Sequence, residues 1–135
     1  YETISYVWGS NDKPCSLLTP DGVVSITENL HSVLRDLRLV DRPRCLWADE
    51  ICINQEDIAE KEYQVTMMAD IYRFCRRVLV YLGPAAEEAS LAFKYLRYYQ
   101  KSRISHGILS ESRLSLIQSP WFHRAWTKQE FILGR

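Results

Sequence analysis

The run Val78-Leu79-Val80-Tyr81-Leu82, closed by Gly83-Pro84, decides the predicted fold. An unbroken apolar stretch of this length is typical of a strand that is covered on both faces, so we expect it at the centre of a sheet. Residues 3–8 and 44–48 are also rich in strand-forming side chains. The second of these runs is followed directly by Asp49 and Glu50.

Helical spacing separates these strands. An apolar stripe at i, i+3, i+4 and i+7 begins at Leu30, after the capping-box pair Ser25 and Glu28, and predicts a helix over residues 27–40. The same reasoning predicts helices over residues 57–75, 87–101, 114–118 and 121–133. Strands that alternate with helices indicate an α/β fold, because parallel strands need crossover connections and helices supply them. We expect a mainly parallel, three-layer, flavodoxin-like sheet with helices on both faces.

A β-hairpin is predicted near the amino end of the chain. Residues 16–19 and 23–26 flank Pro20-Asp21-Gly22, where proline presets φ and glycine accepts a positive φ. Five apolar residues on the predicted core strands and on one helical stripe are expected to be buried: Leu46, Val65, Met68, Leu79 and Val80. If so, Val80→Asp should abolish folding, because it would bury an unpaired charge.

Composition limits the class of protein. The chain has 135 residues, 47% of them hydrophobic, which suits one compact domain over residues 1–135. It opens at Tyr1 rather than Met, so we expect a segment of a longer polypeptide. Seventeen basic residues balance seventeen acidic ones without runs of either sign, so we expect neither nucleic acid nor membrane as a partner. No apolar stretch approaches the roughly 20 residues of a membrane span.

The four cysteines lie far apart and form no C-x-x-C pair, which favours reduced thiols in the cytoplasm. A zinc site built from Cys45, Cys52, Cys75 and His123 is conceivable, but the spacing matches no known ligand pattern. We therefore expect no metal.

Three blocks of sequence, in order, carry a family resemblance. The first is Ile4-Ser5-Tyr6-Val7-Trp8-Gly9, and the longest is Leu46-Trp47-Ala48-Asp49-Glu50-Ile51-Cys52-Ile53-Asn54-Gln55. The third is Trp121-Phe122-His123-Arg124-Ala125-Trp126 with Gln129-Glu130. Together they resemble the fungal heterokaryon-incompatibility (HET) domain. Two residues depart from its usual pattern, Glu50 and Lys128, and neither is expected to inherit a role.

The resemblance implies a cytoplasmic effector of non-self recognition and regulated cell death. The HET family is similar to TIR domains, some of which cleave NAD with a glutamate four residues after a tryptophan, and Trp126 and Glu130 have that separation. This similarity makes NAD a candidate substrate, with no cofactor required. Glu130 would stabilise positive charge on a ribose, although an ion pair with Arg124 or Lys128 is the structural alternative.

The remaining candidate residues follow from their expected positions. In parallel sheets ligands bind beyond the carboxyl ends of the strands, so Trp8-Gly9, Asp49-Glu50 and Gly83-Pro84 should share one rim. Asp49 could act on ribose hydroxyls or water, although capping of the following loop is the favoured reading, as it is for Asn54. Arg124 could hold a pyrophosphate, although stacking on the neighbouring tryptophans or pairing with Glu130 is the alternative. Trp8 and Trp126 could stack on a base, although packing in the core is the alternative for both.

Two hypotheses of function remain open. One is an enzyme that cleaves NAD or a related nucleotide, with Glu130 and Asp49 as its catalytic carboxylates. The other is a protein-interaction domain that acts only by assembling with itself or with a partner, including flanking domains of the same polypeptide.

Overall fold

The computed structural model describes residues 1–83 and 119–124 of the chain. The described elements, in chain order, are β1 (Glu2–Ser5), β2 (Cys15–Thr19), β3 (Gly22–Ile26), α1 (Glu28–Leu37), β4 (Leu46–Trp47), α2 (Asp49–Cys52), α3 (Ile58–Phe74), β5 (Val78–Val80) and the 3₁₀ helix η1 (Pro120–His123). Helices α1 and α3 correspond to the helices predicted over residues 27–40 and 57–75. The helices predicted over residues 87–101 and 114–118, and all but the start of the one over 121–133, lie outside the described residues.

The main sheet is parallel and has the strand order β4-β1-β5. The chain is therefore an α/β protein. The prediction that the run from Val78 forms the central strand is wrong for the described sheet, because β1 lies between β4 and β5. Every residue of β1 is buried, whereas Val80 at the end of β5 is 39% exposed. The more polar strand is central because each of its polar side chains has a partner.

Those partners come from distant parts of the chain. Glu2 pairs with Arg44 and Arg77, and the Thr3 hydroxyl donates to the Cys75 sulfur at 3.3 Å. Ser5 accepts a hydrogen bond of 2.6 Å from the Trp121 indole, which η1 supplies. Burying a polar group is costly unless it is hydrogen-bonded, and these contacts remove that cost.

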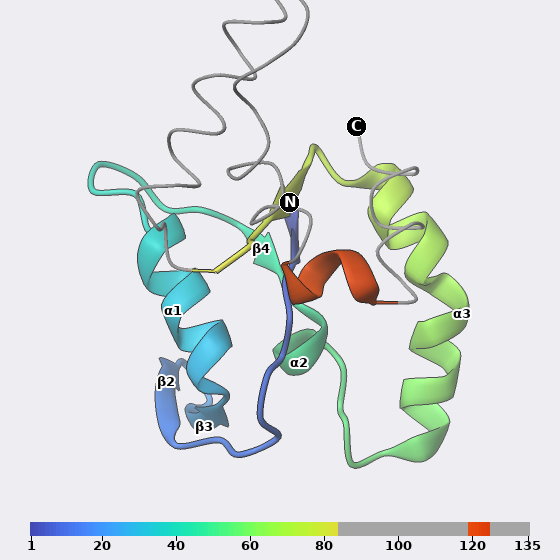
Figure 1. Cartoon of the computed structure of the whole chain (residues 1–135). Helices are drawn as coiled ribbons and strands as arrows, with labels where there is room; N and C mark the ends of the chain where they lie inside the picture. Colours follow the sequence, from blue (N-terminus) through green and yellow to red (C-terminus); the bar gives the residue numbers. More distant parts are fainter. Residues whose placement is uncertain (84–118, 125–135) are drawn as a thin grey trace, which may run out of the picture.

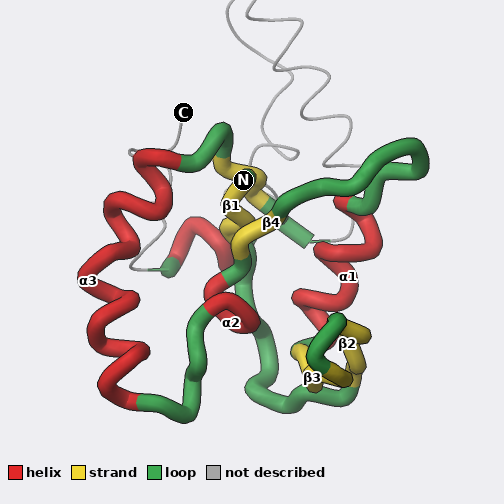
Figure 2. The backbone as a smooth tube through the Cα atoms, turned by 180° about the vertical axis from the view of Figure 1, so that it is seen from behind, coloured by secondary structure: helices red, strands yellow, loops and turns green. Residues whose placement is uncertain are grey.

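Helices α1 and α3 lie on opposite sides of the strands, as seen from the front and from behind (Figures 1 and 2). One hydrophobic cluster joins β1 and β3 to α1: Ile4, Tyr6, Ile26, Leu30, Val33 and Ala48. A second joins α3 to the edge strands, with Ile53, Met68 and Tyr72 packed against Trp47 and Val78. The two clusters together hold the sheet between the helices.

Strands β2 and β3 pair antiparallel, from Cys15 opposite Ile26 to Thr19 opposite Gly22. Gly22 has a φ of +133°, and the Thr19 hydroxyl donates to its carbonyl at 2.9 Å. One cross-strand pair, Leu18 with Val23, faces solvent, at 82% and 68% exposure.

Helix α1 begins with a different cap from the predicted one. Its N-cap is Thr27, whose hydroxyl accepts from the Leu30 amide at 3.2 Å, while Ser25 belongs to β3. The cap predicted for α3 is confirmed, because Asp57 accepts from the Glu60 amide at 3.0 Å.

The five residues predicted to be buried divide into three groups. Met68 is buried, and Leu46 and Leu79 are half-buried. Val65 and Val80 are each 39% exposed, so their prediction is wrong. Helix α3 packs Met68 and Tyr72 against Trp47 and Val78 of the sheet. Val65 lies on the same helical stripe, seven positions before Tyr72, but it is not covered. The expectation that Val80→Asp abolishes folding loses its premise, because the new charge would reach water.

Candidate functional site

The carboxyl ends of β1 and β4 bring Trp8 and Asp49 together. Strand β1 ends at Ser5, and the chain reaches Trp8 three residues later. Strand β4 ends at Trp47, and α2 begins two residues later with Asp49. The Trp8 indole N–H donates to both carboxylate oxygens of Asp49, at 3.0 and 3.1 Å. Two residues 41 positions apart thus meet at the rim where the sequence predicts them.

Asp49 is a half-buried carboxylate with a defined orientation. Its Oδ1 also accepts from the Glu50 amide at 2.9 Å, and its carbonyl accepts from the Gln55 side chain at 2.9 Å. Burial raises the pKa of Asp49, while the bond from Trp8 and the charge of Arg124 lower it in part. A carboxylate can accept at about four positions, so substrate hydroxyls or a water could still bind here.

Glu50 is the buried carboxylate of this rim, at 4% exposure. It accepts three hydrogen bonds: from the Tyr6 hydroxyl at 2.9 Å, from the Thr27 hydroxyl at 2.7 Å and from the Thr27 amide at 2.7 Å. It thereby ties β1 to the start of α1. Burial, together with the charges of Asp49 and Glu50, raises the pKa of Tyr6, so this hydroxyl stays a donor.

Nothing in the sequence around Glu50 predicts this structural role. Its short helix, Asp49–Cys52, has no periodicity that would reveal which face is buried. Only its position could have indicated that Glu50 is buried, since it lies directly after a strand, between the apolar residues Ala48 and Ile51 to Ile53 and next to Asp49.

Arg124 reaches the same rim from the end of the described chain. Its guanidinium donates to the Tyr6 carbonyl, and the Trp121 bond to Ser5 holds η1 against β1. The first and third blocks of the family resemblance therefore touch. A planar cation beside Asp49 suits an anionic or polar ligand.

Gly9 has a structural reason to be glycine. Its φ is +77°, and a Cβ there would lie 2.7 Å from Nδ2 of Asn29, which donates to the Val7 carbonyl at 2.9 Å. A cavity of about 160 Å³ adjoins this turn and is lined by Trp8, Ser10, Asp12, Pro14, Glu28 and Asn29.

Asn54 makes its described contacts with its own loop and with the first turn of α3. Its amide donates to Glu60 at 3.0 Å, and its side-chain oxygen accepts from the Glu56 amide at 3.2 Å. These bonds are of the loop-stabilising kind. Glu130 and Trp126 lie outside the described residues.

Other classes of site find no support in the described part of the chain. Among residues 1–83 and 119–124, no three His, Cys, Asp or Glu side chains are grouped to hold a metal ion. The four cysteines are free thiols. None of the described helices is long and apolar enough to span a membrane.

Comparison with known proteins identifies the family. A family model described as "Heterokaryon incompatibility protein (HET)" matches residues 1–130. The protein "Heterokaryon incompatibility protein 6, OR allele" of Neurospora crassa is 36% identical over 103 residues, which cover 67% of this chain and 15% of that protein. The chain thus spans a small part of that relative's length, and no solved structure matches it. The chain belongs to the heterokaryon-incompatibility (HET) family.

Proposed function

We propose that this chain is an effector module of heterokaryon incompatibility in fungi, which acts in non-self recognition and leads to regulated cell death. The support is the family match over residues 1–130 and the printed name of the Neurospora crassa relative. The module works in the cytoplasm, with a TIR-like, three-layer arrangement, and is activated through protein partners or through flanking domains of its polypeptide.

The proposed chemistry is cleavage of NAD at the carboxyl rim of the sheet. The observation that supports it is the half-buried Asp49, held by Trp8 and close enough to Arg124 for their charges to interact. In this proposal Asp49 binds the ribose hydroxyls or orients a water, and Arg124 binds the pyrophosphate. Glu130 is the carboxylate that stabilises positive charge on the ribose as nicotinamide leaves.

The test is nicotinamide release by the purified chain at concentrations at which it associates. Asp49→Asn keeps an acceptor for Trp8 but removes the charge, and Glu130→Gln does the same at the second carboxylate. Each should lower the rate by at least about a hundredfold, the scale for losing one positioned electrostatic group. Asp70→Asn removes an exposed carboxylate on α3 and should leave the rate unchanged.

Cell toxicity distinguishes cleavage from assembly. If cleavage is the effector activity, toxicity should fall together with nicotinamide release in both variants. A Glu130→Gln variant that folds, assembles and remains fully toxic would contradict the enzymatic proposal and leave a non-enzymatic interaction domain.

Self-association is the second proposed property, and the exposed Leu18–Val23 pair on β2–β3 favours it. Neighbouring exposed apolar side chains form a patch, and larger patches of this kind mark interaction sites. The double variant Leu18→Ser, Val23→Thr should shift the chain toward monomer in analytical ultracentrifugation without loss of folding. Association at the parent's strength would exclude this pair from the interface.

A further inference from the structure

Four arginines line one cavity at the amino ends of the parallel strands, opposite the rim described above. The cavity measures about 310 Å³ and is lined by Tyr1, Glu2, Leu39, Arg42, Pro43, Arg44, Cys45, Arg76 and Arg77. We call it the arginine cavity. Its arginines come from two segments, one just before β4 and one just before β5.

The backbone around the arginine cavity is held together by hydrogen bonds between the strand starts. The Glu2 amide donates to the Cys45 carbonyl at 3.0 Å, and the Thr3 amide donates to the Arg77 carbonyl at 3.1 Å. The Arg76 amide donates to the Tyr1 carbonyl at 2.9 Å. The arginine-bearing segments are thus fixed before any ligand arrives, which lowers the entropic cost of binding.

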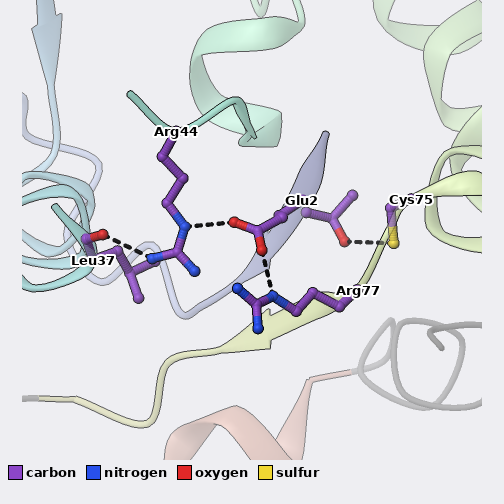
Figure 3. Close-up of polar contacts among 6 residues, drawn as sticks. Glu2, Leu37, Arg44, Cys75 and Arg77 are labelled. Atoms are coloured by element: carbon purple, nitrogen blue, oxygen red, sulfur yellow. Dashed lines mark hydrogen bonds and ion pairs between the residues drawn. The ribbon is translucent and has the colours of Figure 1, made fainter. Parts of the chain in front are cut away.

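Glu2 forms ion pairs with two of the four arginines. Figure 3 shows its carboxylate between Arg44 and Arg77, each bonded to a different oxygen, with Arg44 also donating to the Leu37 carbonyl at 2.8 Å. The hydrogen bond from Arg44, followed by that from Arg77, lowers the pKa of Glu2 to about 2. Glu2 is therefore an anion at neutral pH.

Two arginines have no such partner. Within residues 1–83 and 119–124, Arg42 and Arg76 form no ion pair, and both are exposed. Asp41 is next to Arg42 in the sequence, but it lines the adjoining hollow rather than the arginine cavity. Four guanidinium groups and one carboxylate leave a positive excess in the arginine cavity, in a chain whose total formal charge is zero. Like charges gathered in one hollow repel, so an anion that enters it is favoured.

We infer that the arginine cavity binds a phosphate-bearing small molecule. Guanidinium groups are planar forks that match phosphate oxygens, which makes arginine the preferred partner of phosphate. A volume of about 310 Å³ suits a diphosphate or the phosphate end of a larger ligand. Arg42 and Arg76 supply the primary contacts, and Arg44 and Arg77 are held in place beside them by Glu2.

The neighbouring hollow offers room for an organic group attached to the phosphates. It measures about 540 Å³, shares Leu39, Arg42, Pro43 and Arg44 with the arginine cavity, and adds the apolar side chains of Leu34, Leu37, Val40 and Leu46. Inorganic pyrophosphate and ADP both carry a diphosphate, but only ADP carries an organic group. Comparing their affinities therefore distinguishes a free phosphate ligand from a nucleotide. Equal affinity for the two would mean that the protein contacts only the phosphates. Tighter binding of ADP would mean that its nucleoside binds in the adjoining hollow.

Isothermal titration calorimetry on the whole chain tests the inference, with pyrophosphate, ADP and adenosine as probes. Pyrophosphate and ADP should bind, and adenosine should not. The double variant Arg42→Gln, Arg76→Gln should weaken pyrophosphate binding at least about tenfold, because each lost charge-assisted bond contributes roughly that much. It should fold normally, since both side chains are exposed and form no ion pair in the described structure.

The matched control is Arg35→Gln, Arg73→Gln, which removes the same charge at α1 and α3, outside the arginine cavity. It should bind pyrophosphate like the parent. Failure of the parent to bind pyrophosphate, or equal weakening by the control, would overturn the inference. The result is independent of NAD cleavage, because the arginine cavity and the Asp49 rim lie at opposite ends of the strands.

Discussion

The two ends of the parallel sheet each bury a glutamate, but with different partners. Glu2, at the amino end, is held by the cations Arg44 and Arg77. Glu50, at the carboxyl end, is held by the neutral donors of Tyr6 and Thr27. A buried carboxylate can thus be satisfied by charged partners or by neutral hydrogen-bond donors alone, and the two arrangements should respond differently to substitution.

The largest effect should come from Glu50→Ala. It leaves two hydroxyls and one amide without their acceptor in a buried place, and each orphaned group is costly. We expect the free energy of unfolding, measured by urea denaturation, to fall by about 3–5 kcal/mol. Glu50→Gln keeps one acceptor and should lose clearly less. An alanine variant within about 1 kcal/mol of the parent would mean that Glu50 does not hold β1 to α1.

Glu2→Gln should have the next largest effect, about 2–3 kcal/mol, because it leaves Arg44, whose side chain is 14% exposed, without a counter-charge. The pKa of Glu2 is lowered from 4.5 to about 2, so its contribution is present above pH 4.5 and is lost as the pH falls toward 2. Urea denaturation across this range should show the decline in the parent and not in Glu2→Gln. Asp70→Asn, which breaks an exposed pair with Arg73, is the control and should cost less than about 0.5 kcal/mol.

Gly9→Ala tests the turn that carries Trp8 to Asp49. A Cβ at this position meets Asn29 at 2.7 Å, and the φ of +77° disfavours any side chain. We expect a loss of about 1–2 kcal/mol in thermal or urea unfolding. Gly22→Ala, at a positive φ but with open space around it, separates the two causes, since it carries the backbone strain without the clash. Equal losses in both variants would show that the contact with Asn29 is unimportant.

The smallest effect on stability should come from Asp49→Asn, and its pH dependence should be opposite to that of Glu2. Burial raises the pKa of Asp49 above 3.8, so its contribution to stability is present below that value and is lost as the pH rises through the raised pKa. The variant removes this loss and should be as stable as the parent, or slightly more so, at neutral pH. Denaturation at several pH values measures the difference. A clearly less stable variant at neutral pH would mean that the charge of Asp49 is needed for the fold.

Local patterns in the sequence predict the elements of this domain better than their order in the sheet. The spacing from Leu30 predicts α1, and the Asp57–Glu60 pair marks the start of α3 correctly. The error concerns which strand is central. Val78–Val80 is the more apolar run, yet β1 is buried because Arg44, Arg77, Cys75 and Trp121 satisfy its polar groups. These partners lie up to 116 positions away, and periodicity cannot reveal them.

In the candidate site, too, one feature could be predicted from the sequence and another could not. The meeting of Trp8 and Asp49 follows from the rule that parallel strands end at a common rim, and the sequence predicts it. The burial of Glu50 depends on the side-chain directions of a single helical turn and on the hydroxyls of Tyr6 and Thr27. The spacing of apolar and polar residues near Glu50 predicts neither feature.

The long reach of the contacts to β1 also affects how the chain folds. Ser5 and Tyr6 are bonded by Trp121 and Arg124, across 116 and 118 positions. Contacts between residues so far apart raise the contact order of a fold and slow its formation, because a long loop must close first. During synthesis β1 emerges before Trp121 and Arg124, so its hydrogen bonds to them are completed only after more than a hundred further residues have been added.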